Sequence, residues 1–259
     1  MTKQAIANTF SKAALSYDDA AHLQRRVADR LLALTGERSL APAPVIADLG
    51  TGTGYCLPAL VQRYCPMQLN ALDLSPAMLE QAQWREPTAI PVRGDLEALP
   101  FDTASHHLLI SSLAVQWLDQ PDAFLAEARR VLKTGGRLAI STLTDGTLHE
   151  LKQAWRAADT SPHVNDCLPA EDWRQALAES GFQIEQWQSE RIEVGYPSPL
   201  DLLQELKRLG ANHVKARQGH VSRKALGQML RAYQPFQRPD GQYPASWQVL
   251  YLVLRKTVN

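Results

Sequence analysis

The sequence contains few cysteines and carries no excess of charge of either sign. Its three cysteines form no C-x-x-C pair, which gives no zinc signature and suits a reducing compartment. Lysine plus arginine equals aspartate plus glutamate at 27 each, so no global charge favours nucleic acid or an anionic membrane as partner. No apolar run reaches the roughly 20 residues that span a bilayer, and the N-terminus lacks a signal-peptide pattern. We therefore expect a soluble, cytoplasmic protein without a metal, nucleic-acid or membrane partner.

The clearest local pattern is the stretch 45–54, which reads V-I-A-D-L-G-T-G-T-G. A short apolar run ends at Asp48, three glycines follow at alternate positions, and apolar residues at helical spacing begin with Leu57. This order predicts a buried strand, a tight turn and a helix, which hold a nucleotide-like ligand at the carboxyl edge of a parallel sheet. Glycine lets the ligand approach the backbone, and we expect amides at the helix start to donate to it.

Further strands and helices alternate after this turn. A helix is predicted over 121–132, and the alternating strands and helices have the lengths of β-α units. Repeated β-α units require a mostly parallel sheet with right-handed crossovers. Ser75 is suited to cap a helix that Pro76 begins. The strands of this core are expected near 67–72, 89–92, 107–112, 137–143, 182–194 and 247–254, with helices near 147–158 and 169–180.

The two ends of the chain read as additions to that core. Residues 8–35 have one apolar face and predict a helix that Gly36 ends. Two more helical patterns, 200–209 and 222–233, interrupt the last strands. We divide the chain into an N-terminal helical lid segment (1–40), an α/β core (41–194), a helical insertion over the sheet edge (195–245) and a last core strand (246–259).

Polar residues follow the predicted strands. Asp73 ends the second strand, 19 residues past Gly54, where a carboxylate can accept both hydroxyls of a ribose. A role as helix cap is less favoured, because Ser75 suits that position. Gln116 and Trp117 follow the fourth strand and offer a hydrogen-bonding amide and a large apolar wall. Tryptophan is more often core than site, so position favours function for Gln116 and leaves Trp117 evenly balanced between core and site.

The spacing of the glycines reduces the number of possible ligands. It is not the dinucleotide pattern G-x-G-x-x-G, which makes a nicotinamide cofactor the weaker alternative. Asp48-x-Gly50-x-Gly52-x-Gly54 resembles motif I of the class I S-adenosylmethionine-dependent methyltransferases. The resemblance implies a Rossmann-like α/β fold, a seven-stranded mostly parallel sheet with a helical lid, and S-adenosyl-L-methionine as cofactor. It also implies that Asp95 faces the adenine with Leu96 beside the ring. The cofactor residues expected are Tyr17, Asp48, Gly50, Thr51, Gly52, Gly54, Asp73, Leu74, Met78, Asp95, Leu96 and Ser111.

Other segments resemble one family within that class, the malonyl-acyl carrier protein O-methyltransferases of biotin synthesis. They are Lys3–Ala7, Tyr17-Asp18, Leu23-Gln24, Leu113–Trp117 and Leu206–His213, so the similarity runs nearly end to end. It implies methylation of the free carboxylate of a malonyl group on acyl carrier protein or coenzyme A, giving the methyl ester that starts pimeloyl and biotin synthesis. Two positions depart from the family pattern: His106-His107 replaces Phe-Asp, and Thr134 replaces proline.

The implied chemistry requires no general base. A malonyl carboxylate, with an ordinary pKa of about 4, is already ionised at neutral pH, so alignment and loss of water supply the acceleration. Residues 195–245 hold eight lysines and arginines against three acids, which suits an acidic carrier or a phosphate but also an ordinary solvated face. The substrate residues expected are Tyr17, Gln116, Trp117, Arg130, Lys207, Arg208 and His213, and which cation holds the carboxylate stays open.

Two rival functions remain at this stage. The chain could methylate another small carboxylic acid or metabolite, or it could be a non-catalytic S-adenosylmethionine-binding or RNA-associated protein. Overall neutrality argues against the RNA reading, because RNA binding depends on counterion release by basic groups.

Overall fold

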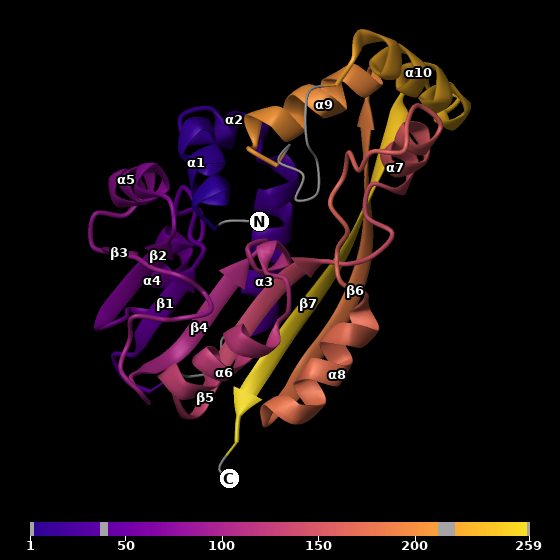
Figure 1. Cartoon of the computed structure of the whole chain (residues 1–259). Helices are drawn as coiled ribbons and strands as arrows, with labels where there is room; N and C mark the ends of the chain where they lie inside the picture. Colours follow the sequence, from indigo (N-terminus) through magenta and orange to yellow (C-terminus); the bar gives the residue numbers. More distant parts are fainter. Residues whose placement is uncertain (1–2, 37–40, 212–220, 258–259) are drawn as a thin grey trace.

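A seven-stranded sheet forms the centre of the protein. The computed structural model describes residues 3–36, 41–211 and 221–257 (Figure 1). The strands are β1 (Val45–Leu49), β2 (Gln68–Asp73), β3 (Ile90–Arg93), β4 (His106–Ser112), β5 (Leu132–Leu143), β6 (Phe182–Tyr196) and β7 (Tyr243–Lys256). Their order across the sheet is β3-β2-β1-β4-β5-β7-β6, and β7 runs in the opposite direction to the other six strands. The predicted mostly parallel α/β sheet of seven strands is confirmed.

Helices cover both faces and one edge of this sheet. They are α1 (Lys3–Ala13), α2 (Tyr17–Ala20), α3 (His22–Thr35), α4 (Leu57–Tyr64), α5 (Pro76–Arg85), α6 (Asp122–Val131), α7 (His149–Arg156), α8 (Ala170–Ser180), α9 (Pro199–Arg208) and α10 (Arg223–Tyr233), with the 3-10 turns η1 (Val115–Trp117) and η2 (Gln234–Phe236). Within the described residues no helix has the length and apolar character needed to cross a bilayer.

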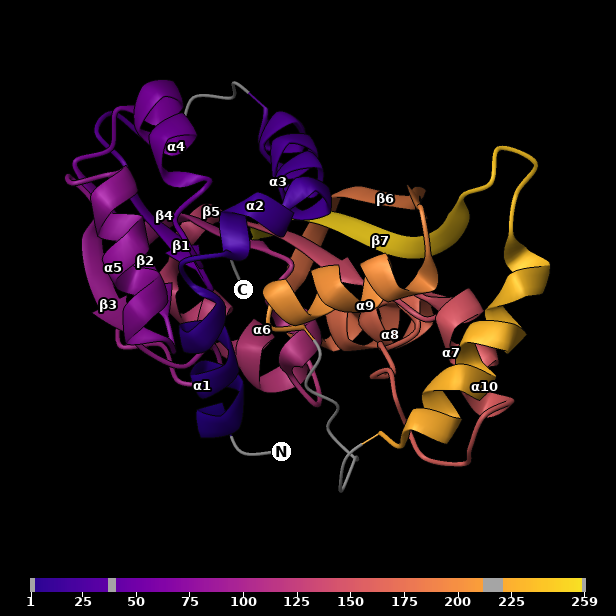
Figure 2. The same cartoon turned by 90° about the horizontal axis from the view of Figure 1, so that it is seen from above.

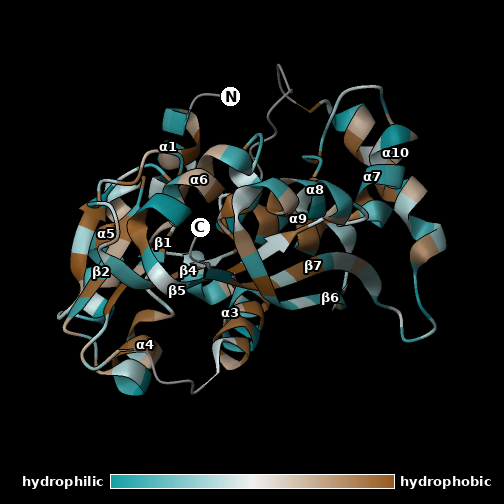
Figure 3. Cartoon of the chain, turned by 90° about the horizontal axis from the view of Figure 1, so that it is seen from below, coloured by the Kyte–Doolittle hydropathy of each residue, from teal (hydrophilic) through white to brown (hydrophobic). Residues whose placement is uncertain are grey.

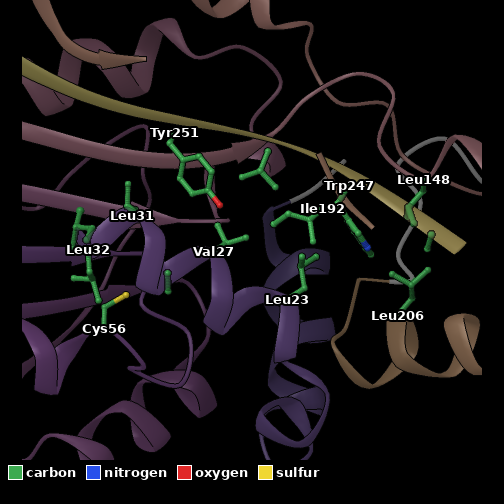
Figure 4. Close-up of a cluster of buried hydrophobic side chains, with 14 of the residues drawn as sticks. Leu23, Val27, Leu31, Leu32, Cys56, Leu148, Ile192, Leu206, Trp247 and Tyr251 are labelled. Carbon is green, nitrogen blue, oxygen red and sulfur yellow. The ribbon is translucent and has the colours of Figure 1, made fainter. Parts of the chain in front are cut away.

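The core consists of two apolar layers, one on each face of the sheet. Alternate side chains of β7 supply both: Trp247, Val249 and Tyr251 join the layer that holds α3 and α4, while Leu250 and Leu252 join the layer that holds α6 and α8. Figure 4 shows α3 directing Leu23, Val27 and Leu31 toward this first layer. The helices are striped, with hydrophilic and hydrophobic residues on different sides (Figure 3). Burial on both sides fixes the register of the sheet, because a one-residue slip would exchange its faces.

Helices from both ends of the chain meet over the carboxyl edge of the parallel strands. Helix α1 contacts α5, α2 contacts α9, and α10 packs on α7 (Figures 1 and 2). The strands β1, β2 and β4 end beneath α1 and α2. This edge is where a doubly wound sheet places its ligand.

The N-terminal helix prediction was wrong in its extent. Three helices replace the single helix expected over 8–35, and the first begins at Lys3. The chain breaks after Ala13, where the backbone amide of Ser16 donates back to the Ala13 carbonyl at 2.9 Å. The break places Tyr17 in the short α2, over the sheet edge. Helix α3 packs mainly on the sheet face and reaches the edge only with its first turns, and Gly36 (φ 69°) ends α3 as predicted.

Two boundaries of the core also differ from the prediction. Strand β5 begins at Leu132, directly after α6, so Thr134 and Gly135 lie in the strand and not in a connecting loop. A register shift opposite β4 and the positive φ of Gly135 (79°) accommodate this irregular start. Strands β6 and β7 extend to Tyr196 and from Tyr243, so the helical insertion is shorter at both ends than 195–245.

Candidate functional site

A first cavity of about 170 Å³ lies between the glycine turn, the ends of β1, β2 and β4, and helices α1 and α2. Most of the predicted cofactor residues meet there, although their elements are far apart in the sequence. Those that line the cavity are Tyr17, Asp48, Gly50, Thr51, Gly52, Asp73, Leu74, Met78, Asp95 and Leu96.

Two predicted cofactor residues do not line this cavity. Ser111 is fully buried and donates to the Leu49 carbonyl at 2.8 Å, whereas its neighbour Ser112 faces the cavity. Gly54 lies against α5, where an added Cβ would come within 2.8 Å of the Ala82 backbone. Both residues stabilise the fold around the site.

The backbone amides of the glycine turn bond to the neighbouring strand β2. The amides of Gly50 and Thr51 donate to the Leu72 carbonyl at 2.8 and 2.9 Å, and the Gly52 amide donates to Asp73 Oδ2 at 3.0 Å. These three turn amides are therefore already bonded within the protein, and the expectation about the amides at the helix start, where α4 begins at Leu57, stays a prediction. Gly50 (φ 70°) is required for space, because its Cβ would lie 2.4 Å from the Ala114 Cβ. The motif shapes the cavity and does not cradle an anion.

Two carboxyl groups form the electrostatic centre of the first cavity. Asp73 accepts from the Ser75 amide at 2.8 Å as well as from Gly52, and burial raises its pKa while these bonds oppose the rise. Asp48 is 2% exposed; burial raises its pKa to about 7, Thr51 opposes this through a 2.7 Å hydrogen bond, and the Asp73 charge adds to it. Neither has an ion-pair partner among the described residues. The cavity therefore favours a cation.

Ion pairs fasten α1 and α2 over this cavity. Lys3 pairs with Asp95 and Glu97 in the loop after β3. Asp18 accepts from Arg85 of α5 and, at 2.7 Å, from the Thr53 hydroxyl beside the glycine turn. Asp95 therefore lines the cavity while one of its oxygens is held by Lys3 of α1.

A second cavity of about 570 Å³ adjoins the first, beneath α7, α9 and α10. Five residues line both cavities and mark their junction: Phe10, Tyr17, Gln24, Leu113 and Trp117. The ring of Phe10 lies 5.4 Å from Trp117, edge to face, and 6.5 Å from Tyr17. This aromatic group forms an apolar wall at the passage between the cavities.

Tyr17 and Gln116 bring polar atoms to the junction region. Burial and the charges of Asp73 and Asp18 raise the pKa of Tyr17, so its phenol stays neutral and able to donate. Gln116 lines the second cavity; its Nε2 donates to the Leu113 carbonyl at 2.6 Å, and its buried Oε1 has no partner among the described residues. Trp117, Tyr17 and Gln116 are thus brought together as expected.

The candidate cations are separated by the structure. Lys207 lines the second cavity, and Arg208 does not. Arg130 is not brought to either cavity: it pairs with Glu127 at 2.7 Å and donates to the Leu99 and Phe101 carbonyls. The structure does not support it as the residue that holds the substrate. His213 lies outside the described residues.

The histidine pair that departs from the family pattern lies at the opposite, amino-terminal end of β4. His106 Nε2 is 2.9 Å from Asn70 Nδ2, and His107 Nδ1 accepts from the Val45 amide at 3.0 Å. The pair ties β4 to β1 and β2, which places it in the fold and not in the site.

Several residues of the second cavity carried no signal in the sequence. They come from α1, α3, α7 and the loop after it, α10 and β7, and no motif joins these segments. Those not named as site residues beforehand are Phe10, Gln24, Trp155, His163, Arg223 and Trp247. Gln24 alone fell in a segment that resembled the family.

Comparison with known proteins agrees with this geometry. Residues 47–140 match the family described as Methyltransferase domain. The chain is 38% identical to the malonyl-[acyl-carrier protein] O-methyltransferase of Serratia marcescens, over 98% of this chain and 96% of that protein. It is 37% identical over 99% of its length to the biotin biosynthesis bifunctional protein BioHC of Teredinibacter turnerae, of which it spans about half (47%). The fold is shared with a geranyl diphosphate methyltransferase solved with S-adenosylmethionine (TM-score 0.55, 16% identity, 90% and 85% of the two chains). The protein belongs to the malonyl-[acyl-carrier protein] O-methyltransferase family.

Proposed function

We propose that the protein transfers a methyl group from S-adenosylmethionine to the free carboxylate of a malonyl group carried on acyl carrier protein. The observation that carries this is the pair of joined cavities, one acidic and one larger and mostly apolar, that meet at Tyr17, Phe10 and Trp117. The names of the relatives supply the substrate, and the geometry supports a reaction between two bound molecules at the junction. Helices α1, α2, α9 and α10 act as the lid of this site.

The residues of the first cavity fit S-adenosylmethionine. Asp73 ends the second strand, where a carboxylate accepts ribose hydroxyls, and Gly52 beside it faces open space, with no atom within 4 Å of an added Cβ. Asp48 is a buried carboxyl without an ion pair among the described residues, which suits the positive charge of a sulfonium amino acid. Asp95 and Leu96 line the same cavity for the base.

The chain's own residues then act by position and by excluding water. When bound, S-adenosylmethionine supplies an electrophilic methyl group, which a carboxylate oxygen takes in an in-line displacement that moves no proton. Phe10 and Trp117 wall the junction, and loss of water there favours the merging of opposite charges into a neutral ester. The neutral phenol of Tyr17 can donate a hydrogen bond and so align a carboxylate. Lys207 and Arg223 line the second cavity and attract an anionic acceptor.

The direct test is turnover of the purified protein with radiolabelled S-adenosylmethionine. Malonyl-acyl carrier protein, malonyl-coenzyme A and free malonate are offered separately, and the product is identified as a methyl ester by mass. We expect the carrier-bound acceptor to react fastest. Transfer to free malonate or another small acid alone would overturn the proposal, as would binding of the donor without transfer to any of them.

The absence of a required proton transfer has its own test. With saturating donor, kcat should stay within about twofold between pH 6 and 9, because the acceptor carboxylate is ionised throughout. A titrating limb that belongs to an enzymic base would contradict the mechanism.

A further inference from the structure

Unpaired polar atoms surround the second cavity. Four buried side-chain atoms in the described residues have no hydrogen-bond partner, and all belong to residues that line this cavity. Native proteins rarely leave such atoms unpaired, because each costs free energy unless a partner or ordered water binds it. The atoms are Gln24 Oε1, Gln116 Oε1, His163 Nδ1 and Trp247 Nε1.

Two of these residues are more than nine-tenths buried. Trp247 is 4% exposed, and in Figure 4 its indole nitrogen points away from β7 into the space between Leu23 and Leu206. The side chain of His163 is 3% exposed and stacks on Trp155, with ring centroids 3.7 Å apart and planes 6° from parallel. Both rings are therefore held rigidly by apolar packing.

The hydrogen-bonding character of the pair is fixed by their surroundings. Indole Nε1 can only donate. His163 Nε2 lies 2.8 Å from Asp159 Oδ1, which can only accept, so Nε2 carries a proton and a neutral imidazole presents Nδ1 as an acceptor. Of the four unpaired atoms, the two on Trp247 and His163 thus form one donor and one acceptor, which is the complement of a secondary amide.

We infer that Trp247 and His163 bind an amide of the pantetheine arm that carries the malonyl thioester. This rests on the proposed function, which brings that arm into the second cavity with its acyl end at the Tyr17 junction. Trp247 Nε1 donates to the amide carbonyl, and His163 Nδ1 accepts from the amide N–H. Asp159 and Trp155 act as positioning residues for the imidazole.

The inference explains how an apolar cavity distinguishes a carrier-bound malonyl group from other small acids. An acceptor without an amide leaves both polar atoms unpaired, and such a site rejects it more strongly than an apolar wall could. Acyl carrier protein and coenzyme A present the same pantetheine arm, so Trp247 and His163 recognise the arm and do not distinguish the two carriers. Lys207 and Arg223 are exposed cations lining the same cavity, and they act on the anionic groups beyond it.

The test compares three small malonyl thioesters: those of pantetheine, of N-acetylcysteamine, and of an alkyl thiol of matched length without an amide. The wild-type kcat/KM should be about 10- to 100-fold higher for an amide-bearing acceptor than for the alkyl thioester. Trp247→Phe, which removes the donor, should lower kcat/KM for the amide-bearing acceptors about tenfold and bring this ratio toward one. His163→Phe should do the same while keeping the stack on Trp155.

Matched controls separate recognition from packing. Trp187→Phe makes the same change at a half-buried tryptophan that lines neither cavity, and the ratio should not move. Affinity for S-adenosylhomocysteine and the melting temperature report on the rest of the fold. If His163→Phe does not fold, the ratio for Trp247→Phe decides.

The outcomes are distinct from a failure of the proposed function. A wild-type protein that turns over malonyl-carrier but does not favour amide-bearing thioesters overturns the inference alone. Equal losses on amide-bearing and alkyl thioesters in Trp247→Phe would also overturn it, since that result means packing. If malonyl-coenzyme A and malonyl-carrier suffer equal losses in the variant, the arm is confirmed as the group that is read. A wild type that methylates no malonyl thioester overturns both proposals.

Discussion

The two cavities differ in how they hold their polar groups. In the first, Asp73 is bonded to two backbone amides, Asp48 to Thr51, and the glycine turn to β2, so the site is built before any ligand arrives. In the second, buried polar atoms of His163, Trp247 and two glutamines have no partner within the described chain. The first cavity is rigid and specific through its own bonds, and the second is completed by what enters it.

The largest effect that tests this difference should come from Asp73. Asp73→Ala removes both the ribose acceptor and the bond that holds Gly52, so affinity for S-adenosylhomocysteine should fall about 100-fold or more. Isothermal titration measures this. Glu80→Ala, at an exposed acid on α5, serves as control and should leave the affinity unchanged. Wild-type affinity in the Asp73 variant would show that the donor lies elsewhere.

A smaller effect should come from a cation that lines the second cavity. Lys207 and Arg208 are adjacent exposed residues on α9, but only Lys207 lines the cavity. Lys207→Glu should raise KM for malonyl-carrier about tenfold, whereas Arg208→Glu should raise it two- to threefold and lose this effect at high salt. Donor affinity should change in neither. Equal effects from the two reversals would mean that general surface charge, and not the cavity, attracts the acceptor.

Asp48 should make donor binding depend on pH, an effect absent from the acceptor side. Because its pKa in the ligand-free protein is about 7, a cationic donor binds the ionised form, and affinity should rise roughly tenfold between pH 6 and 8. Asp48→Asn should bind weakly and without this slope. A wild-type affinity that is flat over this range would refute the assignment.

The same carboxyl should oppose stability. Its raised pKa means that the ligand-free fold binds a proton which the unfolded chain releases, so stability falls as pH rises from about 4 to about 7. Above pH 7 ligand-free Asp48→Asn should be more stable than the wild type by a few kcal/mol at most, by chemical denaturation. The variant would then show that the site exchanges stability for cofactor binding.

The sequence predicted the first cavity better than the second for a physical reason. Asp48, Gly50 and Asp73 lie at strand ends, and the sheet brings strand ends together whatever the loops do. Trp247 and His163 line the same cavity because a long excursion of the chain folds back over the sheet edge, and neither residue lies in a local pattern that indicates this. Arg130 was misassigned because helical spacing does not tell which neighbour, here Glu127, an arginine contacts. The breaks in the N-terminal helix depend on contacts with the turn and α5, such as Asp18 with Thr53 and Arg85.

The smallest effect on activity should come from the histidines at the far end of the sheet, which also test whether the site is confined to the carboxyl edge. Burial lowers the pKa of His106 to about 4. Between pH 6.5 and 4 the unfolded chain therefore binds a proton that the folded protein does not bind. Stability should therefore fall with acid across this window, by about 3 kcal/mol at most. His106→Gln stays neutral and keeps an amide near Asn70, so its stability should depend less on pH. His107→Gln, at a less buried ring, should change the dependence of stability on pH less.

Donor affinity and kcat at pH 7.5 should be unchanged in both variants. A loss of either would mean that the amino-terminal end of β4 is coupled to one of the cavities, and that the carboxyl edge alone does not define the site.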